Sequence, residues 1–172
     1  GFAQNPDILK FLPADKAIFL PYIKESWFRK YTTPKIRNRK KFVIVHAPTN
    51  RFVKGSDKII DAVERLKSSY SIDFRLIENM SHDEAKKNYL EADLLIDQVR
   101  LGWYGGVAVE AMRMGVPVAV YINPLDLHNI PLKMRRDLDE SFLLINPDNI
   151  YERLANLLDD KGSYNRLKEA AI

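Results

Sequence analysis

Residues 92–122 read ADLLIDQVRLGWYGGVAVEAMRMGVPVAVYI, and this stretch decides the fold. Leu94–Ile96 is predicted as a short strand, and Val107–Met114 as a helix that ends at Gly115. A second apolar run, Pro117–Ile122, follows at once and is predicted as the next strand. Strands separated by a helix of this length need a crossover connection, which makes them parallel.

The same alternation continues on both sides of this stretch. Phe42–His46 is a continuous apolar run, as expected for a strand buried on both faces. The other predicted elements are a helix over 56–68, a strand over 72–77, a helix from the capping box at Ser81 to Ala92, a strand over 142–145, and helices near 148–159 and 163–171. The polar stretch 135–140 precedes the last of these strands, and no element is predicted for it. The predicted fold is α/β, a Rossmann-like doubly wound parallel sheet with helices on both faces.

Composition agrees with one such domain carrying an appended segment. The chain has 172 residues, 46% of them hydrophobic and 29% charged. It has no cysteine, which excludes disulfides and thiol chemistry, and its three histidines lack zinc-binding spacing, so no metal is expected. No apolar run approaches the roughly 20 residues that span a bilayer. The expected location is the cytoplasm.

Residues 1–41 have a different pattern. A short helix is predicted from Asn5 to Pro13, followed by the apolar run 17–20 and a basic segment over 22–41. That segment has eight basic residues and one acidic residue, with aromatic residues among them. The favoured interpretation is a solvated linker, and the alternative is a surface for an anionic membrane or nucleic acid.

Three loops leave the carboxyl ends of predicted strands, where ligands bind in open parallel sheets. The first, residues 47–55, carries Arg51 and Lys54 beside a helix N-terminus, whose free amides favour anions. A diphosphate is the expected ligand of these two cations. The alternative is that both are ordinary surface charges.

The second loop, residues 101–106, leads into the helix that carries Glu110. Gly105 and Gly106 let the backbone approach a phosphate closely, with the amides of Gly106 and Val107 directed at it. Glu110 is predicted to accept hydrogen bonds from ribose hydroxyls. The alternative is a carboxylate that only stabilises the helix N-terminus.

The third loop follows the second strand and contains Asn79 and Met80. Asn79 and the backbone of Met80 are candidates for contact with a base edge. An ordinary capped loop is the alternative.

These segments resemble a known family. In residues 92–118, an Ala-Asp strand leads to a glycine turn, then Glu-Ala-Met, then Gly-x-Pro-Val, as in retaining glycosyltransferases of the two-domain GT-B type. Residues 45–55 resemble the first loop of that family. The likeness is close over about 80 residues and extends loosely to residue 160 through residues 145–148 and the following helix.

The resemblance implies roles for individual residues. Arg51 and Lys54 would grip the diphosphate of a nucleotide-sugar, and Glu110, the second glutamate of the family's Glu-x7-Glu motif, would hold the ribose. The amides of Gly105, Gly106 and Val107 would bind the distal phosphate. The implied reaction uses neither metal nor cofactor, because fixed cations and helix amides neutralise the leaving diphosphate.

The chain departs from the family pattern at two places. Gly102 stands where the family has its first, sugar-contacting glutamate. Asp97 and Trp103 are alternative substitutes, and together with Tyr104 and Gly102 they are assigned to the vicinity of the donor sugar. Arg51 also lies closer to Lys54 than is usual in the family.

The resemblance divides the chain into residues 1–41, the end of an N-terminal domain and its linker, and residues 42–172, a donor-nucleotide-binding domain. The acceptor-binding domain and its catalytic groups would belong to the same protein upstream, so this chain alone is expected to bind donor without transferring sugar. The predicted function is sugar transfer to a glycan or lipid-linked acceptor in cell-surface polysaccharide synthesis. The predicted partners include no nucleic acid, and residues 22–41 offer peripheral contact with an anionic membrane. The alternatives are a nucleotide-sugar epimerase of the same architecture and a non-enzymatic basic module that binds membrane or nucleic acid.

Overall fold

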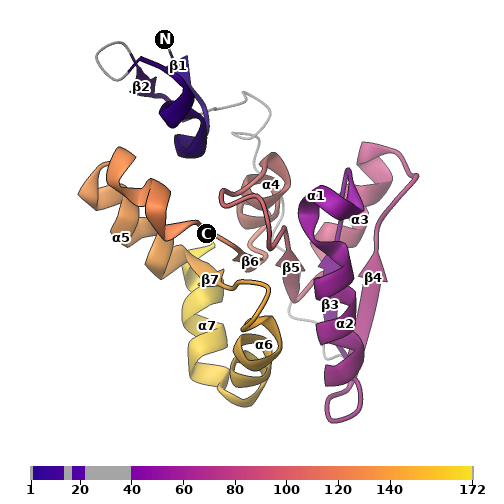
Figure 1. Ribbon diagram of the computed structural model, residues 1–172. Helices are drawn as coiled ribbons and strands as arrows, with labels where there is room; N and C mark the ends of the chain where they lie inside the picture. Colours follow the sequence, from indigo (N-terminus) through magenta and orange to yellow (C-terminus); the bar gives the residue numbers. More distant parts are fainter. Residues whose placement is uncertain (1, 14–16, 22–39, 172) are drawn as a thin grey trace.

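A five-stranded, wholly parallel sheet organises the chain in the computed structural model, which describes residues 2–13, 17–21 and 40–171 (Figure 1). The strands are β3 (Phe42–His46), β4 (Ile72–Leu76), β5 (Leu94–Ile96), β6 (Val118–Val120) and β7 (Phe142–Leu144). They lie in the order β4-β3-β5-β6-β7. The predicted Rossmann-like parallel sheet is confirmed.

Helices cover both faces of the sheet because successive strand residues point to opposite sides. Val43 and Val45 belong to one core with residues of α3 (His82–Glu91), α4 (Gly106–Arg113) and α5 (Leu132–Ser141). Ile44, between them in sequence, belongs to the other core, with residues of α2 (Ser56–Leu66), α6 (Ile150–Asp159) and α7 (Lys161–Ala170). No helix in the described part of the chain is long and apolar enough to cross a membrane.

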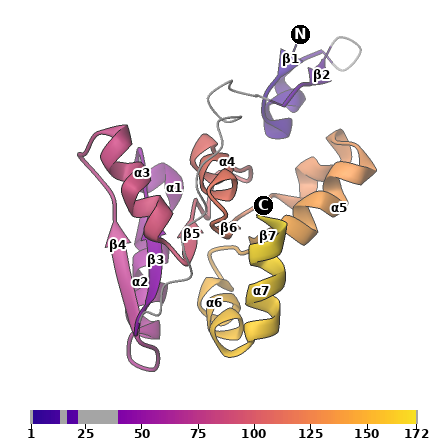
Figure 2. The same cartoon turned by 180° about the vertical axis from the view of Figure 1, so that it is seen from behind.

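The order of the strands creates a switch point between β3 and β5. From β3 the chain crosses to β4 on one side, and from β4 it returns to β5 on the other side of β3. The loops that follow β3 and β5 therefore lead to helices on opposite faces. Such a divergence opens a crevice at the carboxyl end of the sheet. In Figure 2, α1 (Arg51–Lys54) and α4 lie toward this end of the sheet.

The N-terminal segment forms a small unit of its own. β1 (Phe2–Ala3) and β2 (Ile18–Phe19) pair in parallel, apart from the five-stranded sheet, and are joined through the 3-10 helix η1 (Pro6–Phe11). The ring of Phe19 meets that of Trp103 edge-on, with centroids 5.8 Å apart. Most of the basic segment lies outside the described residues, so the domain division after residue 41 stays a prediction.

Four elements differ from the sequence-based expectations. The helix α1 and the 3-10 helix η3 (Pro124–Asn129) were not predicted, because their 4 and 6 residues are too few to show a periodic pattern. α5 covers the polar stretch 135–140, for which no element was predicted. Its only buried residue is Leu138, so tertiary packing stabilises it without a recognisable apolar stripe. The predicted N-terminal helix is the 3-10 helix η1.

Candidate functional site

The loops after β3 and β5 pack directly on one another at the switch point. Asn50 caps α1 by accepting a hydrogen bond from the amide of Val53, and Gly55 ends this turn in the left-handed region at φ 70°. A Cβ atom on Gly55 would lie 2.5 Å from Cγ2 of Val99 in the second loop. The amide of Val99 also donates to the carbonyl of Lys54 at 3.0 Å. The first loop is therefore fixed against the second, with Lys54 at the contact.

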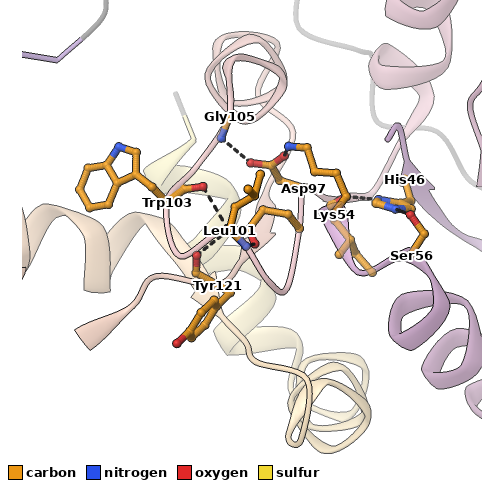
Figure 3. A network of polar contacts seen from close by, with 10 residues as sticks. His46, Lys54, Ser56, Asp97, Leu101, Trp103, Gly105 and Tyr121 are labelled. Carbon is orange, nitrogen blue, oxygen red and sulfur yellow. Dashed lines mark hydrogen bonds and ion pairs between the residues drawn. The ribbon is translucent and has the colours of Figure 1, made fainter. Parts of the chain in front are cut away.

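Lys54 makes a buried ion pair with Asp97. Its Nζ lies 2.5 Å from Oδ1 of Asp97, and the two side chains are 9% and 0% exposed. The other oxygen, Oδ2, accepts a hydrogen bond from the amide of Gly105 at 2.6 Å. Figure 3 shows Asp97 between these two donors. One carboxylate thus joins the cation of the first loop to the start of α4.

Gly105 and the first turn of α4 lie against the same ammonium group. A Cβ atom on Gly105 would be 3.0 Å from Lys54 Nζ, so the turn and the cation are in close contact. Gly105 is the N-cap residue of α4, and no side chain caps it. The amides of Gly106 and Val107 belong to the first turn, where a helix has no internal partner for them. The structure thus brings Lys54 and the Gly105–Val107 turn together, and their binding of a diphosphate stays a prediction.

Gln98 holds the middle of the second loop. It is fully buried, and its side-chain amide donates to the carbonyls of Trp103, at 3.1 Å, and Tyr121, at 2.6 Å. Its Oε1 accepts from the amide of Leu101 at 2.7 Å (Figure 3). Sequence reasoning missed this role. Asp97 and Gln98 are two polar residues directly after a buried strand, and this pattern could have revealed it.

Gly102 has a backbone that excludes the glutamate expected by resemblance. Its φ is 75°, and a Cβ atom would lie 2.9 Å from Cβ of Asn123. Its carbonyl also accepts from the amide of Asn123 at 2.9 Å. A larger residue at this position would be strained in the loop as it stands.

Glu110 lies in the α4 helix beside His82, the first residue of α3. Its side chain is 10% exposed, and Oε2 is 2.8 Å from Nε2 of His82. Burial, reinforced by the nearby charges of Glu110 and Asp97, raises the pKa of Tyr89 to about 12. The carboxylate is thus almost buried and held from α3, a contact that the sequence did not predict.

Arg51 pairs with a different carboxylate, that of Glu78. Its guanidinium makes two hydrogen bonds with the carboxylate of Glu78, one of them at 2.8 Å. These hydrogen bonds raise the pKa of Arg51 and lower the pKa of Glu78. The two side chains are 58% and 24% exposed, so this pair lies in solvent. The Nη1 amino group makes neither of these two hydrogen bonds, so Arg51 has N–H donors left for a ligand even while it binds Glu78.

The third loop follows Glu78. Asn79 has a positive φ of 54°, which an asparagine tolerates in a turn, and Met80 is 41% exposed. Met80 is therefore accessible to a ligand. The base contact itself stays a prediction.

Trp103 and Tyr104 belong to an aromatic stack. Trp103 is 3% exposed, its ring stacks on Tyr104 at 4.9 Å, and Tyr104 stacks on Phe142 at 5.5 Å. Burial raises the pKa of the Tyr104 hydroxyl. Because both rings contact other aromatic side chains, they pack the interior of the domain in this structure.

The last residue of β3, His46, is also buried and polar. The carbonyl of Ile96 can only accept, so Nδ1 carries the proton of the 2.8 Å hydrogen bond between them. Nε2 then accepts from the hydroxyl of Ser56 at 2.7 Å. Burial lowers the pKa of His46, which agrees with this neutral form. The histidine ties β3, β5 and the start of α2 together beneath the first loop.

A metal site is not evident in this arrangement. Among residues 2–13, 17–21 and 40–171, no group of three or more histidine, aspartate or glutamate side chains is placed to hold an ion. The buried charged groups where the two loops meet are instead the paired Lys54 and Asp97, beside the N-terminus of α4.

Comparison with known proteins shows what this fold is similar to. No family model and no curated protein sequence matches the chain. Among solved structures, sucrose-phosphate synthase from Thermosynechococcus elongatus aligns with 99% of the chain at a TM-score of 0.65 and 15% identity. The chain spans about half, 51%, of that protein.

Two further structures align with most of the chain. The C-terminal domain of a glycosyl transferase group 1 family protein (LpcC) from Francisella tularensis covers 77% of it at a TM-score of 0.52 and 14% identity, with 82% of that domain aligned. A Listeria monocytogenes protein assigned as a UDP-N-acetylglucosamine 2-epimerase covers 75% at a TM-score of 0.53 and 16% identity, with 39% of it aligned. The chain therefore has the fold of a glycosyltransferase-type domain, which an epimerase also shares.

Proposed function

We propose that this chain binds the nucleoside diphosphate of a nucleotide-sugar and is the donor-binding part of a glycosyltransferase. One observation carries the proposal. At the switch point of the sheet, the ammonium of Lys54 lies against the Gly105 turn that opens α4, and Glu110 follows on the same helix. A cation and free helix amides favour phosphate, and a carboxylate accepts hydrogen bonds from ribose hydroxyls.

The spacing along α4 supports this assignment. Glu110 is five residues after Gly105, which corresponds to about 7 Å along the helix axis. That span is comparable to the distance between the ribose and the second phosphate of a nucleoside diphosphate. Glu110 would hold the ribose, and the Gly105–Val107 amides with Lys54 would hold the distal phosphate. Arg51 would reach the diphosphate by leaving Glu78, and Asn79 and Met80 would contact the base.

The rest of the proposal concerns the whole enzyme. An acceptor-binding N-terminal domain of the same protein would supply the catalytic groups, and transfer would go to a glycan or lipid-linked acceptor in polysaccharide synthesis. The fixed charges of the site would neutralise the leaving diphosphate without a metal. Work at the cytoplasmic side, with membrane contact through residues 22–41, would fit such an acceptor.

Calorimetric titration tests donor binding. We expect saturable binding of UDP, GDP or another nucleoside diphosphate, weakened by about 1–3 kcal/mol in Glu110→Gln and in Lys54→Met. The matched controls are Glu169→Gln and Lys58→Met, which change exposed residues of α7 and α2. Thermal unfolding of each variant separates lost binding from lost structure. If the unchanged chain shows neither heat nor thermal shift with any nucleotide of the panel, the proposal is wrong.

An epimerase is the second candidate, because the Listeria monocytogenes structure has the same fold. Incubating the full-length protein with a UDP-sugar and no acceptor separates the two activities. An epimerase converts the sugar under these conditions, whereas a transferase leaves it unchanged apart from slow hydrolysis.

A further inference from the structure

Asp97 serves two donors that come from different loops. Oδ1 faces Nζ of Lys54 at 2.5 Å, and Oδ2 faces the amide of Gly105 at 2.6 Å. The side chain of Asp97 is fully buried. Its carboxylate therefore has no contact with solvent in this structure, and both of its oxygens are engaged.

A carboxylate is needed to satisfy this arrangement. Two donors approach two different oxygens of one short side chain, and an ionised carboxylate is an acceptor at both. Asparagine has nearly the same shape but offers one acceptor and one amino group, so one of the two donors would face a second donor. The negative charge also balances the buried ammonium, which would otherwise be strongly disfavoured.

The two donors that Asp97 holds are also the groups best suited to a phosphate. Lys54 has a flexible four-carbon stem, so its charge has a defined position only where a partner fixes it. The Gly105 amide begins the turn whose next two amides start α4. By binding both, Asp97 sets the distance between the cation and the helix N-terminus.

We propose that Asp97 is a positioning residue for the distal phosphate of the donor. It holds Lys54 and the Gly105 turn in one phosphate-binding unit and does not itself touch the sugar, in contrast to the role expected from sequence. Its full burial beneath Lys54 and Gly105 supports this role over contact with a sugar. The inference rests on the proposed donor binding.

The test compares nucleotides that differ only in the second phosphate. The affinities of the 172-residue chain for UDP and UMP, and for GDP and GMP, are measured by calorimetry before and after Asp97→Asn. We expect diphosphate affinity to fall about tenfold or more, because charge-assisted contacts to the second phosphate are misplaced. Monophosphate affinity should change by less than about twofold, since ribose and base contacts lie elsewhere.

Asp93→Asn is the matched control. Asp93 lies just before β5, whereas Asp97 lies just after it, at the other end of the strand. The side chain of Asp93 accepts a hydrogen bond from the amide of Val43 at 2.8 Å. It lies at the amino end of the sheet, so its replacement should leave the diphosphate-to-monophosphate ratio unchanged. If Asp97→Asn does not fold, Asp97→Glu takes its place, because it keeps the charge and both acceptor oxygens but moves them by one methylene. We expect the same fall in the ratio of diphosphate affinity to monophosphate affinity.

The outcomes separate the two proposals. Equal weakening of diphosphate and monophosphate in a folded Asp97 variant, or no weakening at all, overturns the positioning role and leaves donor binding intact. If the unchanged chain binds no nucleoside diphosphate, the proposed function fails, and the role of Asp97 fails with it. Selective loss of the second-phosphate contribution supports both.

Discussion

Two ion pairs extend from the same turn of helix, and they differ in almost every physical respect. Arg51 and Lys54 are three residues apart in α1, and each binds a carboxylate from another loop. The Arg51–Glu78 pair is solvent-exposed, whereas the Lys54–Asp97 pair is almost entirely buried. Exposed pairs contribute little to stability and exchange partners easily, while a buried pair cannot lose one member without leaving an unpaired charge. One turn of helix thus presents one exchangeable cation and one fixed cation.

Breaking the buried pair should have the largest effect. Lys54→Met keeps most of the side-chain volume but leaves Asp97 without its cation, and we expect a loss of about 3–5 kcal/mol in the free energy of unfolding. Urea denaturation measures it, with Arg51→Met as the control that should not measurably change stability. Because Lys54→Met/Asp97→Asn removes both charges, it should recover most of the loss. A single variant as stable as the unchanged chain would show that the pair is not a fixed part of the domain.

Gly102→Glu tests whether the loop that carries Asp97 is as rigid as the buried pair requires. This substitution introduces the glutamate that the family resemblance led us to expect at position 102. Its Cβ would lie against Asn123, and the backbone of residue 102 is in the left-handed region. We expect a destabilisation of about 1–2 kcal/mol or more from the backbone strain alone, measured by urea denaturation. Gly102→Ala should show most of the same loss, because the strain begins at Cβ. If Gly102→Glu has the same free energy of unfolding as the unchanged chain, the loop adjusts its backbone and is not rigid.

The pH dependence of stability should report His46, a buried polar residue at the end of β3 beneath the first loop. Its pKa is lowered in the folded chain, so the unfolded chain takes up a proton first as the pH falls below about 6.5. Stability from the neutral imidazole is therefore fully present above that pH and is lost below it, by up to about 1.4 kcal/mol for each unit of lowering. His46→Gln keeps a donor and an acceptor without titrating. Unfolding free energies measured from pH 7.5 to pH 5 should fall less steeply in this variant.

The exposed pair should give the smallest effect, visible only in ligand binding. If Arg51 exchanges Glu78 for a diphosphate, Arg51→Met should weaken UDP or GDP binding about twofold to fivefold at low salt. The difference should vanish near 0.5 M salt, because solvent-exposed charges are then screened, whereas the effect of Lys54→Met should persist. Titration at two salt concentrations measures both. An effect of Arg51→Met that is independent of salt would contradict the distinction between the two cations.

Sequence reasoning predicted the sheet and its order of elements because each strand is a short apolar run bounded by recognisable helices. Phe42–His46 matches its predicted range, and the capping box at Ser81 is present. α5 was missed because only Leu138 among its residues is buried, so no apolar period marks it. Its stability depends on packing that the local sequence does not show.

The sequence predicted which residues lie near the candidate site better than it predicted the contacts between them. Lys54 and the Gly105 turn could be expected at the carboxyl end of a parallel sheet, because each follows a buried strand in the sequence. That Lys54 binds Asp97, or that His82 holds Glu110, could not be derived, because side-chain pairing between loops depends on how the strands order themselves. Gly102 illustrates the same limit, since only the backbone angle shows why a glutamate does not fit.

The buried amide of Gln98 has a consequence for how such a domain can diversify. Three backbone groups of the surrounding loops depend on this one side chain, so the path between Asp97 and Gly105 has a set length and shape. An insertion there would leave carbonyls and an amide unpaired in the interior. Under the proposed function, differences in donor sugar among such domains would therefore arise from residues outside this loop, because Gln98 fixes its length and shape.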